Sequence, residues 1–222
     1  MNARPRSTTG WTIFGPNMRF KAVVFDFDGT LIDSAEAKRE AFFRLFPAEP
    51  PFRAIVTRIL ATDPDGSRHA VIPRMIEAME KQKLSLPAGH NASDRIGAYA
   101  QAVYAAQRTA AECPGAGDLL RKLKDRAAIY ISFNTPEPDL GNLVAARGWS
   151  DLVDGLYGHP RNKRETLAML VERHDGANDE VAVVGDGESD EHAARDVGCP
   201  FFRICGPGAL ADIARKLGFV RV

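Results

Sequence analysis

Residues 23–30 read VVFDFDGT, an apolar run that ends on two carboxylates separated by one residue. The β-branched and aromatic residues predict a strand over residues 20–27, buried on both faces. Residues two apart on a strand point to the same side, so Asp26 and Asp28 can face one point in space. Two carboxylates that close repel each other unless a cation or a shared proton relieves them. The pattern favours a metal-assisted site, with an ordinary acidic strand-to-loop turn as the alternative.

The composition is typical of a soluble globular protein with no global charge. The 222 residues suit one domain of generous size or a domain with an insertion, and 45% of them are apolar and 26% charged. Lysine plus arginine equals aspartate plus glutamate at 29 each, so nothing global favours nucleic acid or an anionic membrane. Cys113, Cys199 and Cys205 are odd in number and lack CxxC spacing. This argues against a disulfide framework and a structural zinc site, and favours a cytoplasmic location.

The order of predicted elements divides the chain into a core and an inserted helical module. Residues 1–18 have basic character but lack an apolar signal core, so we expect a flexible N-terminal tail. Residues 34–112 show helical spacing broken by proline and glycine turns, which predicts a separate helical unit. The core comprises residues 19–33 and 113–222, where strands alternate with helices. This alternation implies a parallel sheet covered on both faces, with the ligand crevice at the carboxyl ends of its strands.

A second predicted strand ends on acids in the same way. Residues 183–190 read VVGDGESD, and Asp186 and Asp190 are four apart, so near a helix start their side chains can reach the same region. With Asp26 and Asp28 they form a predicted carboxylate cluster, and oxygen-only ligands favour Mg²⁺ over zinc. Acidic residues at a helix N-terminus are the alternative for this stretch alone. Two acid-tipped strands in one parallel sheet argue against that alternative.

These motifs resemble those of the haloacid dehalogenase superfamily of phosphohydrolases, in its phosphoglycolate phosphatase-like subgroup. Residues 26–30, DFDGT, match the DxDGT signature, and residues 185–190, GDGESD, match GDxxxD. Lys163 lies in order between them, where the family places a lysine. Arg161 and Arg164 are the alternative candidates for this position. The combination of all three elements is far more specific than any one of them.

The resemblance assigns roles to these residues. It implies that Asp26 attacks the phosphorus to form an aspartyl-phosphate, and that Asp28 protonates the leaving alcohol and later activates water. Mg²⁺ would bind Asp26, the main-chain carbonyl of Asp28, and Asp186. Asp190 would support the metal or Lys163. A carboxylate is a weak nucleophile, so its attack on an anionic phosphate requires the metal and the lysine to neutralise charge.

The family's phosphate-binding hydroxyl is harder to place. At the end of the second core strand, residues 131–136 read ISFNTP. Measured from the strand, Ser132 takes the donor position, whereas measured back from the proline the position falls on a phenylalanine. Either the loop carries one extra residue, or Asn134 or Thr135 takes over the donor role; we favour Ser132. We also assign Thr30, which closes the first motif, to substrate binding.

The resemblance covers residues 21–204 and implies a doubly wound, Rossmann-like parallel sheet with an inserted α-helical cap, residues 34–112. Caps exclude water and contact the part of the substrate beyond its phosphate. Arg68, just after the turn at residues 65–67, is the cap residue that we expect to reach the substrate. A solvated helix face is the alternative for this arginine.

The sequence therefore predicts a Mg²⁺-dependent phosphatase for a small phosphorylated metabolite, a monomer or homodimer without nucleic-acid or membrane partners. A haloacid dehalogenase needs no leaving-group acid, so Asp28 argues against that activity. A sugar-phosphate mutase of the same superfamily usually has a histidine where this chain has Lys38. The irregular region at Ser132 leaves a phosphate-binding regulatory module without turnover as a further alternative.

Overall fold

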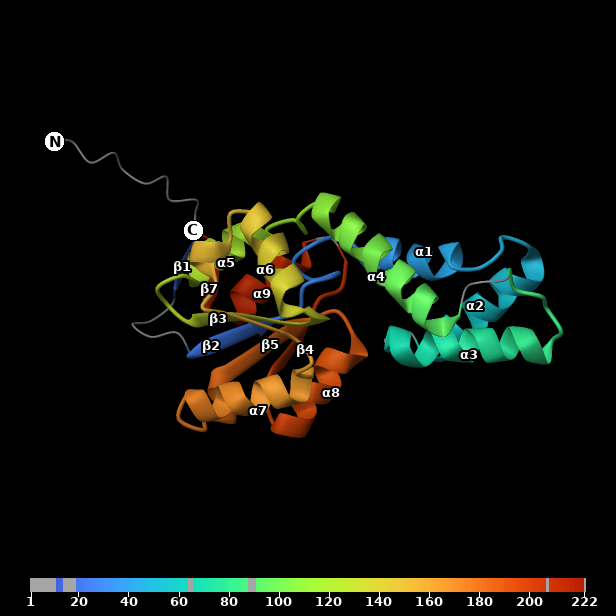
Figure 1. The fold of residues 1–222 in the computed structure, drawn as a ribbon. Coiled ribbons are helices and arrows are strands. Elements are labelled where there is room, and N and C mark those ends of the chain that lie inside the picture. The colour runs from blue at the N-terminus through green and yellow to red at the C-terminus, as the bar shows by residue number, and fades with distance from the viewer. Residues whose placement is uncertain (1–10, 14–18, 64–65, 88–90, 207, 222) are drawn as a thin grey trace. The chain divides into compact units, whose positions relative to one another are not determined.

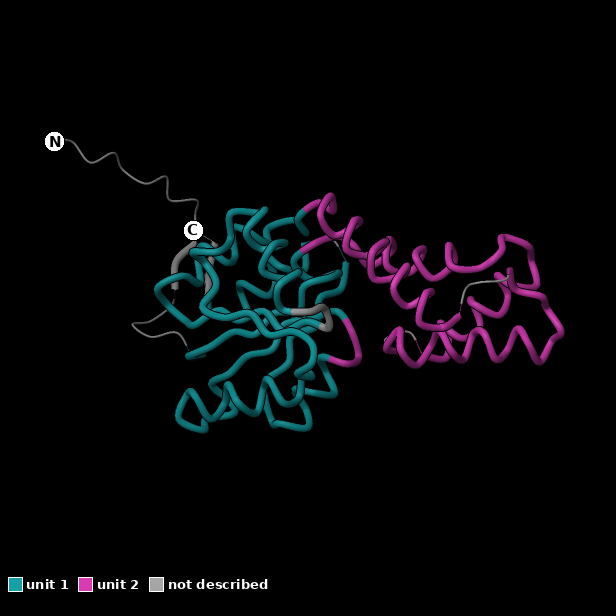
Figure 2. The backbone as a smooth tube through the Cα atoms, viewed as in Figure 1, with its two compact units in different colours: residues 1–31, 112–186, 190–222 teal, residues 32–111, 187–189 magenta. Residues whose placement is uncertain are grey.

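The computed structural model describes residues 11–13, 19–63, 66–87, 91–206 and 208–221, and only the backbone of residues 11–13, 134–136 and 219–221. The chain divides into two compact units (Figure 2). Unit 1 comprises Met1–Leu31, Glu112–Asp186 and Asp190–Val222, and unit 2 comprises Ile32–Ala111 and Gly187–Ser189. Each unit has a buried hydrophobic cluster of its own.

Unit 1 is built on a five-stranded parallel sheet with the order β4-β3-β2-β5-β6 (Figure 1). Its strands are β2 Ala22–Phe25, β3 Ala128–Pro136, β4 Gly155–His159, β5 Val181–Gly185 and β6 Phe201–Arg203. The chain runs outward from β2 through β3 to β4, and β5 then begins on the other side of β2. The strand order therefore reverses between β2 and β5, which is where α/β sheets place their ligands. The predicted doubly wound α/β fold is confirmed.

Helices cover both faces of this sheet. They are α5 Ala116–Leu123, α6 Glu137–Ala146, α7 Lys163–Arg173, α8 Glu188–Val197 and α9 Ala209–Lys216, with 3₁₀ turns at Ser150–Leu152 and Asn178–Glu180. In Figure 1, α7 and α8 lie on one face of the sheet, and α5, α6 and α9 lie on the other. On the first face Val24 and Val183 belong to one buried cluster with Leu167 of α7 and Ala194 of α8. The central strands β2 and β5 are buried along their whole length, which explains why their sequences are continuously apolar.

A short antiparallel pair joins segments from near the two ends of the chain. Strand β1, Trp11–Ile13, pairs with β7, Phe219–Arg221. We expected a flexible tail over residues 1–18, and this strand lies within it. Its formation depends on a partner segment at the far end of the chain, which the local composition of the tail does not reveal.

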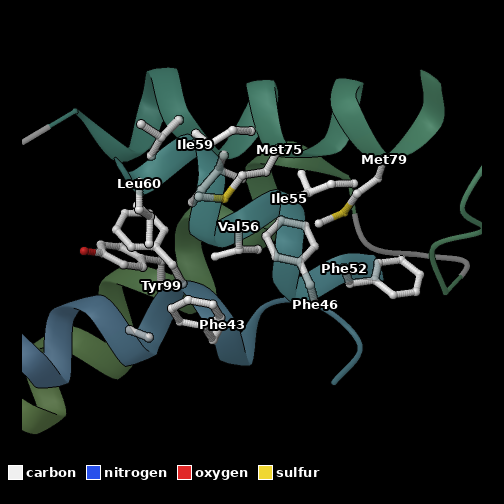
Figure 3. Packing of buried hydrophobic residues seen from close by; sticks show 14 of the residues in the cluster. Phe43, Phe46, Phe52, Ile55, Val56, Ile59, Leu60, Met75, Met79 and Tyr99 are labelled. Carbon is white, nitrogen blue, oxygen red and sulfur yellow. The ribbon is translucent and has the colours of Figure 1, made fainter. Parts of the chain in front are cut away.

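The described part of unit 2 is helical and has a core of its own. Its helices are α1 Ala35–Arg44, α2 Pro50–Thr62, α3 Arg68–Lys81 and α4 Ala92–Thr109. Aromatic, branched and methionine side chains from all four helices and the α1–α2 connection fill this core, among them Phe43, Phe46, Ile55, Met75 and Tyr99 (Figure 3). Ser67 and Asn91 cap α3 and α4 by accepting main-chain hydrogen bonds, as short polar side chains do at helix starts. Among the described residues, none of the helices combines the length and hydropathy needed to cross a membrane.

A histidine at the end of α7 makes the stability of unit 1 depend on pH. The Tyr130 hydroxyl of β3 lies 3.0 Å from Nε2 of His174. Burial, followed by the nearby Arg173, lowers the pKa of His174. Because the folded pKa is lowered, this histidine favours folding above its unfolded pKa of about 6.5, and that contribution is lost as the pH falls towards the folded pKa.

We expect His174→Gln to reduce this pH dependence, because the amide can bond Tyr130 from the same position without titrating. Urea unfolding between about pH 7.5 and pH 5 should show a smaller loss of stability in H174Q than in the wild type. Equal losses in the two proteins would contradict the assignment.

Candidate active site

The candidate active site lies at the carboxyl ends of the two central strands, β2 and β5. Phe25 pairs with Val184, and the main-chain N–H of Asp26 donates to the Val184 carbonyl at 2.9 Å. Asp26 thus follows β2 beside the point where Asp186 follows β5. Carboxylate oxygens of Asp26, Asp186 and Asp190 lie within 4.8 Å of one another. The fold therefore brings together three of the acids that the two motifs predicted.

Lys163 provides a positive charge within this carboxylate cluster. Its ammonium donates to Asp26 Oδ1 at 2.8 Å and to Asp190 Oδ1 at 2.7 Å. The three side chains are 10%, 6% and 4% exposed, in that order, so water screens these ion pairs little. Burial by itself would lower the pKa of Lys163, but Asp26 and Asp190 outweigh burial and raise that pKa above its usual range.

A capping box fixes the position of Lys163. The Asn162 side chain accepts from the Glu165 N–H at 2.9 Å, and the Glu165 side chain accepts from the Asn162 N–H at 3.2 Å. This reciprocal pair satisfies main-chain donors that the helix start leaves open. Helix α7 therefore begins at Lys163, and of the three basic residues considered for the family's lysine this one contacts the acids.

The cluster holds more carboxylates than its one lysine can balance. Burial raises the pKa of the Asp190 carboxyl, Asp26 raises it further, and Lys163 only partly offsets these effects. Asp190 Oδ2 is buried and has no hydrogen-bond partner among the described residues. A buried carboxylate oxygen in this state is costly unless a cation or donor reaches it. Three converging carboxylates fit a hard divalent cation such as Mg²⁺.

Two glycines let the acidic side chains fold closely over the strand ends. Gly29 has a φ of 71°, and a Cβ atom there would lie 2.1 Å from Asp186 Oδ2. A Cβ atom at Gly185 would lie 2.5 Å from Asp190 Cγ. Any larger residue would displace a carboxylate, so space requires glycine at both positions, and at Gly29 the left-handed backbone favours glycine as well.

Two of the predicted hydroxyl groups, those of Ser132 and Thr30, are buried. Ser132 lines a small pocket together with Asp26, Lys163 and Asp190. The register between β3 and β4 shifts between Ser132, opposite Tyr157, and Pro136, opposite His159, so β3 carries extra residues there. This irregularity explains why counting from the strand and counting from the proline disagree.

The remaining predicted ligands are less closely defined. The Thr30 hydroxyl is buried and has no hydrogen-bond partner among the described residues. The side chains of Asn134 and Thr135 lie outside the described part of the structure. Asp28 is buried, but its carboxylate does not belong to the described cluster of mutually close oxygens. Arg68 begins α3 in unit 2, and its contact with a substrate stays a prediction.

Sequence reasoning missed Arg203. Its guanidinium Nη1 donates to the main-chain carbonyl of Asp186 at 2.8 Å. The only available signal was its position, because it ends β6 at the edge of the sheet where the acids also lie.

The family model for haloacid dehalogenase-like hydrolases matches residues 20–198. The chain belongs to this family. The match covers both acidic motifs and Lys163, so the resemblance inferred from the motifs is confirmed. No curated protein sequence matches the chain.

Several solved structures share the fold of this chain at low sequence identity. The HAD-hydrolase YfnB from Bacillus subtilis, bound to magnesium, has a TM-score of 0.67 at 16% identity, over 90% of this chain and 99% of that one. A predicted phosphoglycolate phosphatase from Haemophilus somnus has a TM-score of 0.65 at 18% identity, over 82% and 84% of the two chains. CbbY from Rhodobacter sphaeroides, in complex with xylulose-(1,5)bisphosphate, has a TM-score of 0.62 at 19% identity, over 84% and 87%.

We expect Gly29→Ala to weaken metal binding, because its methyl group would collide with Asp186. Gly148→Ala is the matched control, since Gly148 has a φ of 66° and a Cβ atom there would come within 4 Å of no described residue beyond its chain neighbours. Both variants should lose about 1–2 kcal/mol of stability from the left-handed backbone alone. Only G29A should also weaken Mn²⁺ binding, measured by electron paramagnetic resonance, by about tenfold or more. Equal Mn²⁺ binding in the two variants would contradict the steric role of Gly29.

Proposed function

We propose that this protein is a Mg²⁺-dependent phosphoric monoester hydrolase that acts on a small phosphorylated metabolite through an aspartyl-phosphate on Asp26. One observation carries the proposal: the buried Lys163 ammonium lies between Asp26 and Asp190, at the strand ends where the sheet order reverses. Membership of the hydrolase family supports the reaction class. The surplus of carboxylates supports the requirement for a cation.

In the first step a carboxylate oxygen of Asp26 attacks the phosphorus of the ester. A bond forms between that oxygen and the phosphorus while the bond from the phosphorus to the alcohol oxygen breaks. Asp28 gives its proton to the departing alcohol oxygen, as a general acid. Lys163 keeps Asp26 oriented and offsets the negative charge of the phosphate.

In the second step water cleaves the aspartyl-phosphate. Asp28, now a carboxylate, takes a proton from a water molecule whose oxygen attacks the phosphorus. The bond between Asp26 and the phosphorus breaks, inorganic phosphate leaves, and both aspartates return to their starting forms. The Ser132 hydroxyl donates a hydrogen bond to a phosphate oxygen in both steps.

The residues that would hold Mg²⁺ are Asp26, Asp186 and the main-chain carbonyl of Asp28, supported by Asp190. The bound ion would neutralise the charge that the phosphate and the carboxylates bring together. One similar structure is that of a predicted phosphoglycolate phosphatase, and another is a complex with xylulose-(1,5)bisphosphate. Small sugar phosphates and phosphoglycolate are therefore the first substrates to test. The inserted helices, the predicted cap at residues 34–112, are the proposed source of selectivity among them.

We expect Asp26→Asn to lower phosphate release from the preferred substrate by at least about a thousandfold, because the amide cannot act as the nucleophile. EDTA should abolish release in the wild type, and added Mg²⁺ should restore it. Asp175→Asn is the matched control, since the Asp175 side chain is 85% exposed. Activity of D26N near that of D175N would exclude Asp26 as the nucleophile.

The role of Asp28 predicts a dependence on the leaving group. Nitrophenolate departs without a proton, so Asp28→Asn should still release one equivalent of nitrophenol from p-nitrophenyl phosphate in a rapid burst. Turnover should then stall, because the second step lacks its base. With an alkyl phosphate the same variant should lose the first step as well, by roughly a hundredfold or more. Equal losses with the two esters and no burst would argue against this assignment.

A further inference from the structure

The side chain of Arg203 links the turn that carries Asp186 to helix α8. Arg203, the last residue of β6, donates from Nη1 to the main-chain carbonyl of Asp186 at 2.8 Å. Its Nη2 also forms an ion pair with Glu191 of α8. All three residues belong to unit 1.

The backbone places Arg203 where it can reach this turn. In the β5–β6 ladder Gly185 is the partner of Arg203, and the Ile204 N–H donates to the Gly185 carbonyl at 2.8 Å. Beyond this last partner pair, Arg203 continues the contact between the two strand ends through its side chain. The Asp186 carbonyl is thereby tied to β6.

Asp186 directly follows β5 and carries the third carboxylate of the cluster. It is half-buried, whereas Asp26 and Asp190 are buried. Its carboxylate also lies in the narrow space above Gly29, where a Cβ atom would come within 2.1 Å. A small movement of the turn would therefore change the distance between Asp186 and the other acids.

We propose that Arg203 is a positioning residue for Asp186 and that it sets the metal affinity of the site by holding the Asp186 main-chain carbonyl. The inference deepens the proposed function and rests on its metal requirement. Arginine suits this role because its planar guanidinium presents several donors in a fixed arrangement, so one side chain binds both the carbonyl and Glu191. Residues that orient metal ligands from outside the coordination shell typically change metal affinity by 10–100-fold.

The sign of the effect separates positioning from simple electrostatics. Arg203 is a cation near an acidic cluster, so removing its charge would by itself favour the binding of a divalent cation. A positioning role predicts the opposite, because Asp186 loses its fixed place. Weaker binding in Arg203→Gln therefore supports positioning, and unchanged or tighter binding overturns it.

The test is a Mn²⁺ titration of the metal-free, full-length protein without substrate, followed by electron paramagnetic resonance. We expect Arg203→Gln to raise the Mn²⁺ dissociation constant by about tenfold or more. Excess Mg²⁺ should then restore most of kcat, because Arg203 does not act on the substrate. Arg215→Gln is the matched control, since Arg215 forms an exposed ion pair with Asp212 on α9, and it should bind Mn²⁺ like the wild type.

Glu191→Gln tests the second arm of the bridge. If Glu191 acts by holding the guanidinium, E191Q should weaken Mn²⁺ binding less than R203Q, and the double variant should bind no more weakly than R203Q. Should R203Q fail to unfold cooperatively, Arg203→Met decides the question, because it keeps a long unbranched side chain but has no donor for the Asp186 carbonyl. Folded R203M that binds Mn²⁺ as R215Q does would overturn the proposal.

The outcomes also separate this inference from the proposed function. A wild-type protein that hydrolyses no phosphate ester, yet binds Mn²⁺ more tightly than Asp186→Asn and R203Q, would refute the phosphatase and support the role of Arg203. Normal Mg²⁺-dependent phosphate release with unchanged Mn²⁺ binding in R203Q would refute Arg203 alone. Absence of Mn²⁺ binding in the wild type would overturn the inference.

Discussion

The buried contact of the Lys163 ammonium with the carboxylates of Asp26 and Asp190 is the interaction on which the rest of unit 1 depends. Removing one partner of a buried ion pair typically costs about 3–5 kcal/mol, because the other charge is left without compensation. That is a large fraction of the roughly 5–15 kcal/mol by which a domain is stable. The fold must therefore hold the Lys163 ammonium and both carboxylates in place together. The cluster still has a surplus of negative charge, which a bound cation would balance.

The topology of the sheet brings these charged residues together from separate segments of the chain. Asp26 follows β2, Asp186 follows β5, and the reversal of strand order makes these two strand ends neighbours. Lys163 comes from the start of α7, which the capping box of Asn162 and Glu165 fixes. Each charged group is thus placed by the end of a regular element, where main-chain hydrogen bonds limit its movement.

The space around the carboxylates limits which residues can surround them, as their charge does. Gly29 and Gly185 leave the volumes that the carboxylates of Asp186 and Asp190 occupy. Arg203 donates a hydrogen bond to the main-chain carbonyl of Asp186. The same close approach that gathers ligands for a cation therefore makes the site sensitive to changes of a single methyl group or a single hydrogen bond.

The sequence by itself determined the fold class, the two acid-tipped strands and the lysine, because strand and helix periodicity and motif spacing are local properties of the chain. The tertiary structure decided the rest. Strand β2 ends at Phe25, so strand alternation does not extend to Asp28, and the clustered carboxylate beside Asp26 is Asp186. The contact of Arg203 escaped prediction, and the irregularity after Ser132 was one of the alternatives that the sequence left open. Each of these features depends on which distant segment of the chain lies beside it. In a parallel sheet the order of the strands and their crossover connections decide this, and no local sequence pattern encodes them.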